Sequence, residues 1–357
     1  MAETLLITGH EAIARGAIQA GCRHFFGYPI TPQSEIPEFM ARELPKIGGV
    51  FVQSESESGS IYMLYGAALA GARVMTSTAS VGFSLMQEGM SHIADNEVPC
   101  VIIEVTRMGP GMGSTLQSQT DYKQVTKGGG HGGYHCIVLA PASAQEDFDL
   151  TQLAFHLADK YRMPAIVLTD CVVGWTLEPV ETRTLDFGPV PEKSWALKGK
   201  AQKGGKREMI LAGPFSRGGF VRFLVLLKEK YEQVAQAEVR YETYKTEDTD
   251  LLLVAYGYVA RACKEAVDMA RAEGLKVGLI RPITLWPFPE EALRTAALKA
   301  GKVLVVEDSE GQLVKDVEQW VRYQVPVHLL GIWGRVGEAM GDLIYPERIL
   351  EEVKGLL

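Results

Sequence analysis

Hydrophobic residues alternate between two patterns along the first half of the chain. Short apolar runs typical of β-strands occupy residues 23–27, 50–53, 73–77, 100–105, 135–139 and 164–168. Apolar residues at helical spacing lie between them, at residues 12–20, 33–42, 58–70, 83–94 and 144–161. The run 100–105 is almost continuously apolar, as expected for a strand buried on both faces of a parallel sheet. The alternation predicts a doubly wound, parallel-sheet α/β domain over residues 1–177.

This alternation breaks between residues 178 and 249 and then resumes. The interruption contains Gly188-Pro189-Val190-Pro191 and a helical pattern at residues 221–232, so we predict a partly ordered connector. Strand-like runs follow at residues 251–255, 276–280, 302–307 and 327–330, and helical patterns at 259–273, 290–300, 312–323 and from 346 onward. Residues 250–357 are therefore predicted to form a second, smaller α/β domain.

Composition and charge argue against several kinds of partner and cofactor for this protein. The formal net charge of −8 argues against nucleic acid as the main partner. No apolar run reaches the ~20 residues that span a bilayer, and the N-terminus lacks the pattern of a secretion signal. The five cysteines contain no CxxC pair, which disfavours disulfides, cysteine-held zinc and iron–sulfur clusters. We expect a cytoplasmic protein without membrane or nucleic-acid partners.

Ligands of open parallel sheets bind beyond the carboxyl ends of the strands, and two loops there carry candidate side chains. The loop Gly27–Pro32 contains two prolines and presents the Thr31 hydroxyl, either to a ligand or as the cap of the next helix. The run Gln53–Gly59 places Glu55 and Glu57 before a helix rich in small residues. Acids at a helix N-terminus are normally solvated, but this helix is predicted to be buried, and a buried carboxylate needs a partner.

Two further segments follow later strands. Arg107 stands just past the apolar run 100–105, where its guanidinium could bind a substrate carboxylate or pair with a neighbouring acid. The glycine-rich segment Gly128–Cys136 contains His131, His135 and Cys136. Its glycines oppose a helix that would align the histidines, so a loop bordering a site is favoured over a metal site. We expect no metal on this chain.

Missing motifs limit what the chain can do alone. It contains no GxxxxGK[ST] phosphate loop. It also lacks a Gly-Asp-Gly followed at the usual distance by Asn, the pattern that holds magnesium and diphosphate in thiamine enzymes. No cysteine cluster is present to carry electrons.

The loops and several other segments together resemble the α subunits of 2-oxoacid:ferredoxin oxidoreductases. The matching segments are Gly27–Pro32, Gln53–Gly59, Gly66–Ser80, Gly82–Glu88, Pro99–Gly113, Arg281–Pro289 and Val305–Leu313. The resemblance implies a thiamine-diphosphate-type pyrimidine-binding domain and a transketolase-C-terminal-like domain. The stretch from Gln117 to Gly132 looks closest to subunits for branched-chain 2-oxoacids, such as 3-methyl-2-oxobutanoate, whereas related subunits act on 2-oxoglutarate.

The resemblance also implies roles for single residues. Glu57 stands nine residues before Gly66-Ala67 and matches the glutamate that hydrogen-bonds N1′ of the aminopyrimidine ring, with Glu55 as the alternative. Such a glutamate promotes proton transfer at the 4′ nitrogen of the ring. The other matched residues are Tyr28 and Pro29 beside the cofactor, and Thr31 and Arg107 beside the substrate, where the arginine meets or shields its carboxylate.

The implied reaction is oxidative decarboxylation of a 2-oxoacid to acyl-CoA and CO2, with coenzyme A as co-substrate and ferredoxin as electron acceptor. A β subunit is expected to hold the diphosphate and Mg²⁺ of thiamine diphosphate. Iron–sulfur clusters are expected on that subunit or on a ferredoxin-like subunit, and a γ subunit is expected as well. This chain would then be inactive alone.

Two other interpretations fit part of the pattern. The pyrimidine-side subunit of a lipoamide-linked 2-oxoacid dehydrogenase or a transketolase-like enzyme would share the domain and its glutamate. The segments Tyr28–Pro32 and Trp286–Pro289 favour the ferredoxin-linked group over these. A non-catalytic α/β binding or scaffold protein would keep both domains, but it would not need Glu57, Arg107 and Thr31 at strand ends.

Overall fold

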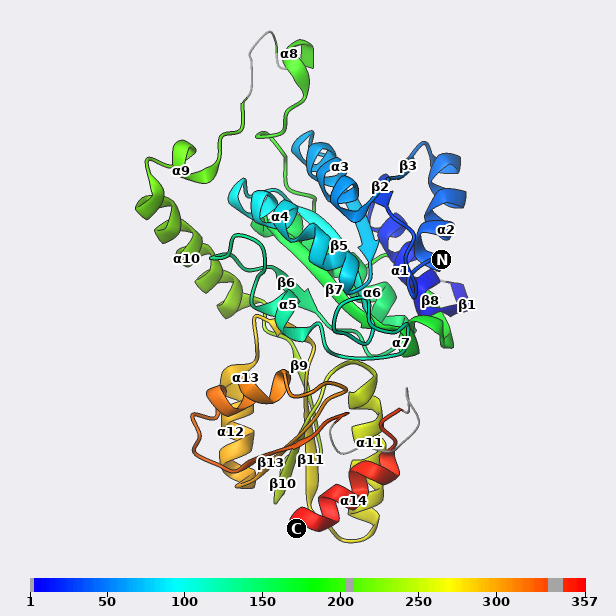
Figure 1. Ribbon diagram of the computed structural model, residues 1–357, viewed down its shortest axis with the longest axis vertical. Coiled ribbons are helices and arrows are strands. Elements are labelled where there is room, and N and C mark those ends of the chain that lie inside the picture. The colour runs from blue at the N-terminus through cyan, green and yellow to red at the C-terminus, as the bar shows by residue number, and fades with distance from the viewer. Residues whose placement is uncertain (1–2, 203, 205–208, 333–342) are drawn as a thin grey trace.

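A computed structural model describes the chain except for residues 1–2, 203, 205–208 and 333–342. Figure 1 shows two α/β regions joined end to end, one built on a seven-stranded sheet and one on a five-stranded sheet. In the described part of the chain, no helix is both long and apolar enough to cross a membrane. All five cysteines are buried and free.

The seven-stranded sheet has the order β12-β6-β7-β5-β4-β2-β3. Six of its strands match the predicted runs and pair in parallel. The seventh, β12, runs antiparallel to β6 and was not predicted; it comes from the second half of the chain. The strands are β2 (His24–Gly27), β3 (Val50–Gln53), β4 (Val74–Thr78), β5 (Cys100–Thr106), β6 (Ile137–Leu139), β7 (Pro164–Asp170) and β12 (Thr284–Trp286).

Helices cover both faces of this sheet, which confirms the doubly wound fold (Figure 1). Helices α1 (Gly9–Gln19), α2 (Glu35–Glu43) and α6 (Ala144–Tyr161) pack on one face, and α3 (Glu57–Leu69) and α4 (Val81–Asp95) on the other. Alternate residues of β5 enter the two cores, which explains its continuous apolar run. Short helical turns are η1 (Leu44–Ile47), α5 (Tyr122–Thr126) and α7 (Cys171–Trp175).

The predicted connector contains more regular structure than its single helical pattern indicated. Strand β8 (Leu177–Thr182) pairs antiparallel with β1 (Glu3–Thr8) in a separate two-stranded sheet. Helix α10 (Phe220–Ala237) contains and extends the predicted helix. The remaining elements are α8 (Gly199–Gln202), α9 (Gly213–Ser216) and β9 (Tyr241–Tyr244).

The five-stranded sheet has the order β14-β13-β10-β11-β9, in which only the edge strand β9 is antiparallel. Its other strands are β10 (Leu251–Val254), β11 (Val277–Pro282), β13 (Val303–Val306) and β14 (Val327–Leu330). Helices α11 (Gly257–Ala272) and α14 (Pro346–Leu356) cover one face. Helices α12 (Glu290–Ala300) and α13 (Leu313–Trp320) cover the other, within a core that continues into the larger sheet.

Candidate functional site

The predicted side chains lie beyond the carboxyl ends of three strands of the larger sheet, β5, β2 and β3. Thr31 follows β2, Glu57 opens the helix after β3, and Arg107 comes directly after β5. The structure brings two of them into contact, because Arg107 Nη1 donates a hydrogen bond to the Thr31 carbonyl oxygen over 3.0 Å. This edge of the sheet is where open α/β folds bind ligands.

Glu57 is a buried acid at the first turn of α3. Glu57 has 5 % of its surface exposed to solvent, whereas Glu55 lies at the surface of the protein. Ser56 caps the helix by accepting a hydrogen bond from Gly59 N–H. No described group makes a hydrogen bond with the Glu57 carboxylate. The carboxylate packs against Gly82, where a Cβ would come within 2.5 Å of Glu57 Oε1. A buried carboxylate without a partner is costly, so Glu57 fits an external donor and Glu55 does not.

Arg107 is 7 % exposed and has no acidic partner among the described residues. Its Nη2 donates to the Met112 carbonyl oxygen over 2.8 Å, beside the bond from Nη1 to Thr31. Its Nε is buried without a partner in the described part of the chain. Because a guanidinium has five N–H groups, donors remain for a carboxylate. No described acid forms a direct ion pair with Arg107, although its charge acts on the buried Glu104 and Asp121.

Buried hydrogen bonds of Gln33 and Ser77 hold the loop that carries Thr31 in place. Gln33 is fully buried, and its Nε2 donates to the Tyr28 carbonyl oxygen over 3.2 Å. Ser77 Oγ donates to Gln33 Oε1. Thr31 is exposed and does not cap α2, whose N-cap is Ser34. The Thr31 hydroxyl is therefore presented outward.

The residues 15–246 match a family model described as "Pyruvate flavodoxin/ferredoxin oxidoreductase, thiamine diP-bdg". The chain belongs to this family. Residues 249–349 match the "Pyruvate:ferredoxin oxidoreductase core domain II" model. The second sheet is thus the second domain of the same family, and the resemblance seen in the loops is confirmed.

Individual relatives agree with this assignment. The ketoisovalerate oxidoreductase subunit VorB of Methanothermobacter marburgensis is 47% identical over 315 residues, 88% of this chain and 89% of that protein. The 2-oxoglutarate synthase subunit KorA of the same organism is 37% identical, with full coverage of both chains. A solved 2-oxoglutarate:ferredoxin oxidoreductase from Magnetococcus marinus superimposes with a TM-score of 0.82 at 26% identity. The match covers 99% of this chain but 65% of that chain.

The family's cofactor fits the residues found here. The matched model is a thiamine-diphosphate-binding one, and a buried carboxylate without a partner suits a ring nitrogen that carries or shares a proton. Glu57 is a buried carboxylate of this kind. The chain lacks the motif for diphosphate and Mg²⁺, so only the pyrimidine end of the cofactor is matched.

Sequence reasoning missed three buried polar residues behind Arg107. They are Ser80, Glu104 and Asp121, at 7 %, 0 % and 6 % exposure. Burial and then the charge of Asp121 raise the pKa of Glu104 well above its usual value. Burial also raises the pKa of Asp121 to about 6. An acid inside an apolar strand could have signalled Glu104, but no local pattern marks Asp121.

The glycine-rich segment packs against α4. A Cβ on Gly129 or Gly130 would collide with Gln87, and the ring of His135 stacks on Trp286 at 4.7 Å. Among the described residues, no group of three or more His, Cys, Asp or Glu side chains could hold a metal. The close approach to α4 accounts for Gly129 and Gly130.

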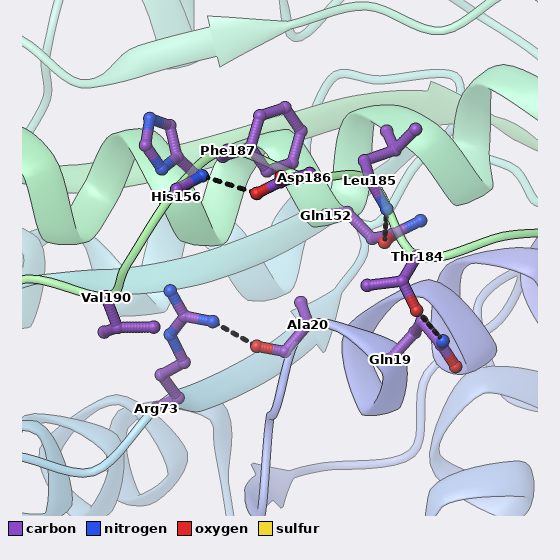
Figure 2. Close-up of a pocket in the computed structure, with 11 residues that line it drawn as sticks. Gln19, Ala20, Arg73, Gln152, His156, Thr184, Leu185, Asp186, Phe187 and Val190 are labelled. Carbon is purple, nitrogen blue, oxygen red and sulfur yellow. Dashed lines mark hydrogen bonds between the residues drawn. The ribbon is translucent and has the colours of Figure 1, made fainter.

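A cavity of about 410 Å³ lies at the opposite, amino-terminal end of the larger sheet (Figure 2). It forms where the start of the connector packs over α1 and α6. Leu185 N–H donates to Gln152 Oε1 over 3.1 Å, and Gln19 Nε2 donates to Thr184 Oγ1. These contacts attach the connector to the domain, and none of the predicted site residues lines this cavity.

Proposed function

We propose that this chain supplies the pyrimidine-facing half of a thiamine-diphosphate site in a heteromeric enzyme that oxidatively decarboxylates a branched-chain 2-oxoacid to acyl-CoA. The observation that carries the proposal is Glu57, a buried carboxylate without a partner in the described chain, at the carboxyl edge of a sheet of this family. We propose that Glu57 binds the pyrimidine ring and that Arg107 and Thr31 bind the substrate.

Each of the proposed residues acts on a different part of the cofactor or of the substrate. Thiamine diphosphate, when bound, supplies the carbon that adds to the keto group and accommodates the electron pair left by CO2. Glu57 holds a proton at the ring nitrogen and fixes the orientation of the ring. The free N–H groups of Arg107 bind the substrate carboxylate, and the exposed Thr31 hydroxyl donates to an oxygen of the 2-oxoacid. Tyr28 and Pro29 form the wall of the loop beside the cofactor.

Other subunits complete this site in the proposal. A β subunit holds the diphosphate and Mg²⁺, and iron–sulfur clusters on it or on a ferredoxin-like subunit pass electrons to ferredoxin. A γ subunit belongs to the same assembly, and coenzyme A accepts the acyl group. The absence from the sequence of a diphosphate motif and of a cysteine cluster supports this division of roles.

Similarity favours a branched-chain substrate over 2-oxoglutarate. The two ketoisovalerate oxidoreductase subunits are 47% and 43% identical to this chain. The 2-oxoglutarate synthase subunits are 37% to 40% identical. The solved relative carries 2-oxoglutarate and coenzyme A, so 2-oxoglutarate is the competing substrate.

The test is co-purification with the β subunit, followed by CoA-dependent dye reduction. Pyruvate, 2-oxoglutarate and 3-methyl-2-oxobutanoate are compared by kcat/KM, and the branched-chain acid should be preferred. Titration calorimetry with thiamine diphosphate, with and without the β subunit, tests cofactor sharing. Binding should require both subunits, and no binding in either state would overturn the proposed function.

A further inference from the structure

The backbone of Arg107 is held by buried side chains to which the proposed function gives no role. Ser80 Oγ accepts a hydrogen bond from Arg107 N–H over 2.9 Å and lies 3.1 Å from the Arg107 carbonyl oxygen. The same hydroxyl bonds to the Asp121 carboxylate. Thr120 Oγ1 donates to the Arg107 carbonyl oxygen over 3.3 Å. The position of Arg107 therefore depends on Ser80 and on the segment that contains Asp121.

Ser80 is kept in an unfavourable backbone conformation. Its φ is +23°, which non-glycine residues rarely adopt. Such strain persists only where surrounding contacts enforce it, and it concentrates at functional sites. The contacts that enforce it here include the bonds to Arg107 and Asp121.

Asp121 stands in a cluster of charges. The fully buried carboxylate of Glu104 interacts with it, and the backbone N–H of Ser80 is a nearby donor that makes no well-formed hydrogen bond to Glu104. The Arg107 charge favours ionised Asp121, and the Glu310 charge opposes it. Tyr256 also faces Asp121. Two neighbouring buried carboxyls resist ionising together, and burial raises the pKa of Asp121 to about 6. Asp121 is therefore protonated below this pH and ionised above it.

The charge of Asp121 determines which bonds Ser80 can make. A serine hydroxyl has one hydrogen to donate. When Asp121 is ionised, Ser80 donates to it and only accepts from Arg107. When Asp121 is protonated, it can donate to Ser80 Oγ, and the Ser80 hydrogen can turn to the Arg107 carbonyl. Protonation therefore changes the hydrogen bonds that hold the Arg107 backbone.

The second domain fixes the segment around Asp121. Gln119 N–H donates to the Asp308 carbonyl oxygen over 2.7 Å, and Asp308 N–H donates to Gln119 Oε1 over 3.0 Å. Gln312 Nε2 donates to the Thr120 carbonyl oxygen. Both partners follow β13, at the carboxyl end of the second sheet. Helix α5, which begins next to Asp121, lies between the two domains in Figure 1.

We propose that Asp121 is a positioning residue for Arg107, acting through Ser80, and that the second domain sets its place through Gln119 and Gln312. The inference rests on the proposed function, because it takes Arg107 as the group that binds the substrate carboxylate. It adds a role for the second domain, which contributes none of the proposed binding side chains.

The test is Asp121→Asn in the reconstituted complex with the β subunit. Asn keeps the size of Asp but cannot ionise. We expect KM for the 2-oxoacid to rise about tenfold, the effect of losing one hydrogen bond to a charged group, with kcat and thiamine diphosphate affinity unchanged. The ratio of wild-type to variant kcat/KM should increase from about pH 5.5 to about pH 7.5, because wild-type Asp121 ionises over this range. An unchanged KM, or a ratio independent of pH, would overturn the proposal.

Asp316→Asn is the matched control. Asp316 is also a buried aspartate at the domain junction, but it accepts from Tyr122 Oη over 2.8 Å and pairs with Lys127. We expect a lower Tm without a change in KM or in the pH dependence. If Asp316→Asn raises KM as Asp121→Asn does, the effect is a general loosening of the junction and the proposal is wrong.

Ser80→Gly gives a second route if Asp121→Asn fails to fold. Glycine tolerates the positive φ and removes the small CH2OH side chain together with its hydroxyl. It should raise KM by a similar factor, and adding Asp121→Asn should raise KM little further, because both act through one link. Additive effects would contradict that link. Inactive wild-type complex that does not bind thiamine diphosphate would instead count against the proposed function.

Discussion

The two ends of the seven-stranded sheet differ in how their buried charged side chains are paired. At the amino end, around the cavity in Figure 2, Arg73 Nε donates to Asp159 over 2.7 Å, and its Nη1 donates to the Ala20 carbonyl oxygen. At the carboxyl end, the Glu104 carboxylate and Arg107 Nε are buried without a hydrogen-bond partner in the described chain, and no described residue forms an ion pair with buried Glu57. Buried polar groups without partners cost free energy. In the proposed function, ligands pair with Glu57 and Arg107 at the carboxyl end, whereas the cavity at the other end lies where the connector packs on the domain.

The largest expected effect at the carboxyl end comes from buried Glu57, and exposed Glu55 is its matched control. Glu57→Gln should reduce turnover in the reconstituted complex about a thousandfold, within the range for losing a positioned acid–base group, while subunit assembly survives. Exposed Glu55→Gln should stay close to wild type. Steady-state dye reduction and size-exclusion chromatography measure both. Near-normal activity of Glu57→Gln with an inactive Glu55→Gln would move the assignment by two residues.

Arg107→Ala tests the second unsatisfied group. It removes a charged donor from the substrate carboxylate, so kcat/KM for the 2-oxoacid should fall about a hundredfold. Affinity for thiamine diphosphate, measured by calorimetry with the β subunit, should not change. An unchanged kcat/KM would rule out a substrate role for Arg107.

A substitution at the amino end of the sheet should lower the stability of the protein and leave its activity unchanged. Arg73→Ala leaves Asp159, 5 % exposed, with Lys193 as its remaining ion-pair partner. We expect unfolding in urea to need about 1–3 kcal/mol less, with kcat/KM unchanged. Arg42→Ala, which breaks an exposed pair with Glu43, is the control and should have little effect. A large loss of kcat/KM in Arg73→Ala would remove the distinction between the two ends.

Much of the fold follows from the apolar pattern, because six strands of the larger sheet are short, mainly apolar runs between turn residues. The paired strands β1 and β8 escaped prediction because most of their residues are exposed or half-buried. Strand β12 has three residues and joins a sheet from which it is distant in sequence. Such pairing depends on tertiary contacts that a local pattern does not contain.

The candidate site likewise combines features that the sequence predicts with features that depend on tertiary packing. The positions of Glu57 and Arg107 at strand ends are visible in the sequence, because strand runs and helix starts mark them. The bond between Ser80 and Asp121 joins residues that are 41 positions apart, and no spacing rule links them. The strain at Ser80 and the missing partners of Glu104 likewise depend on the packing of several elements.

The smallest effect is expected from Glu104, a fully buried acid with no proposed ligand contact. Its pKa is raised in the folded chain, mainly by burial. Above the unfolded value of about 4.3, the folded state keeps a proton that the unfolded state has released, so stability falls as pH rises. Glu104→Gln lacks this dependence.

Its Tm should therefore exceed that of the wild-type chain by about 2 °C near pH 8 and by less near pH 5, as measured by differential scanning calorimetry. Exposed Glu38→Gln on α2 serves as the control and should shift Tm equally at both pH values. If Glu104→Gln also gave equal shifts, Glu104 would be ionised in the folded chain with an unidentified partner. The carboxyl end would then differ less from the amino end, and the buried acid behind Arg107 would no longer separate them.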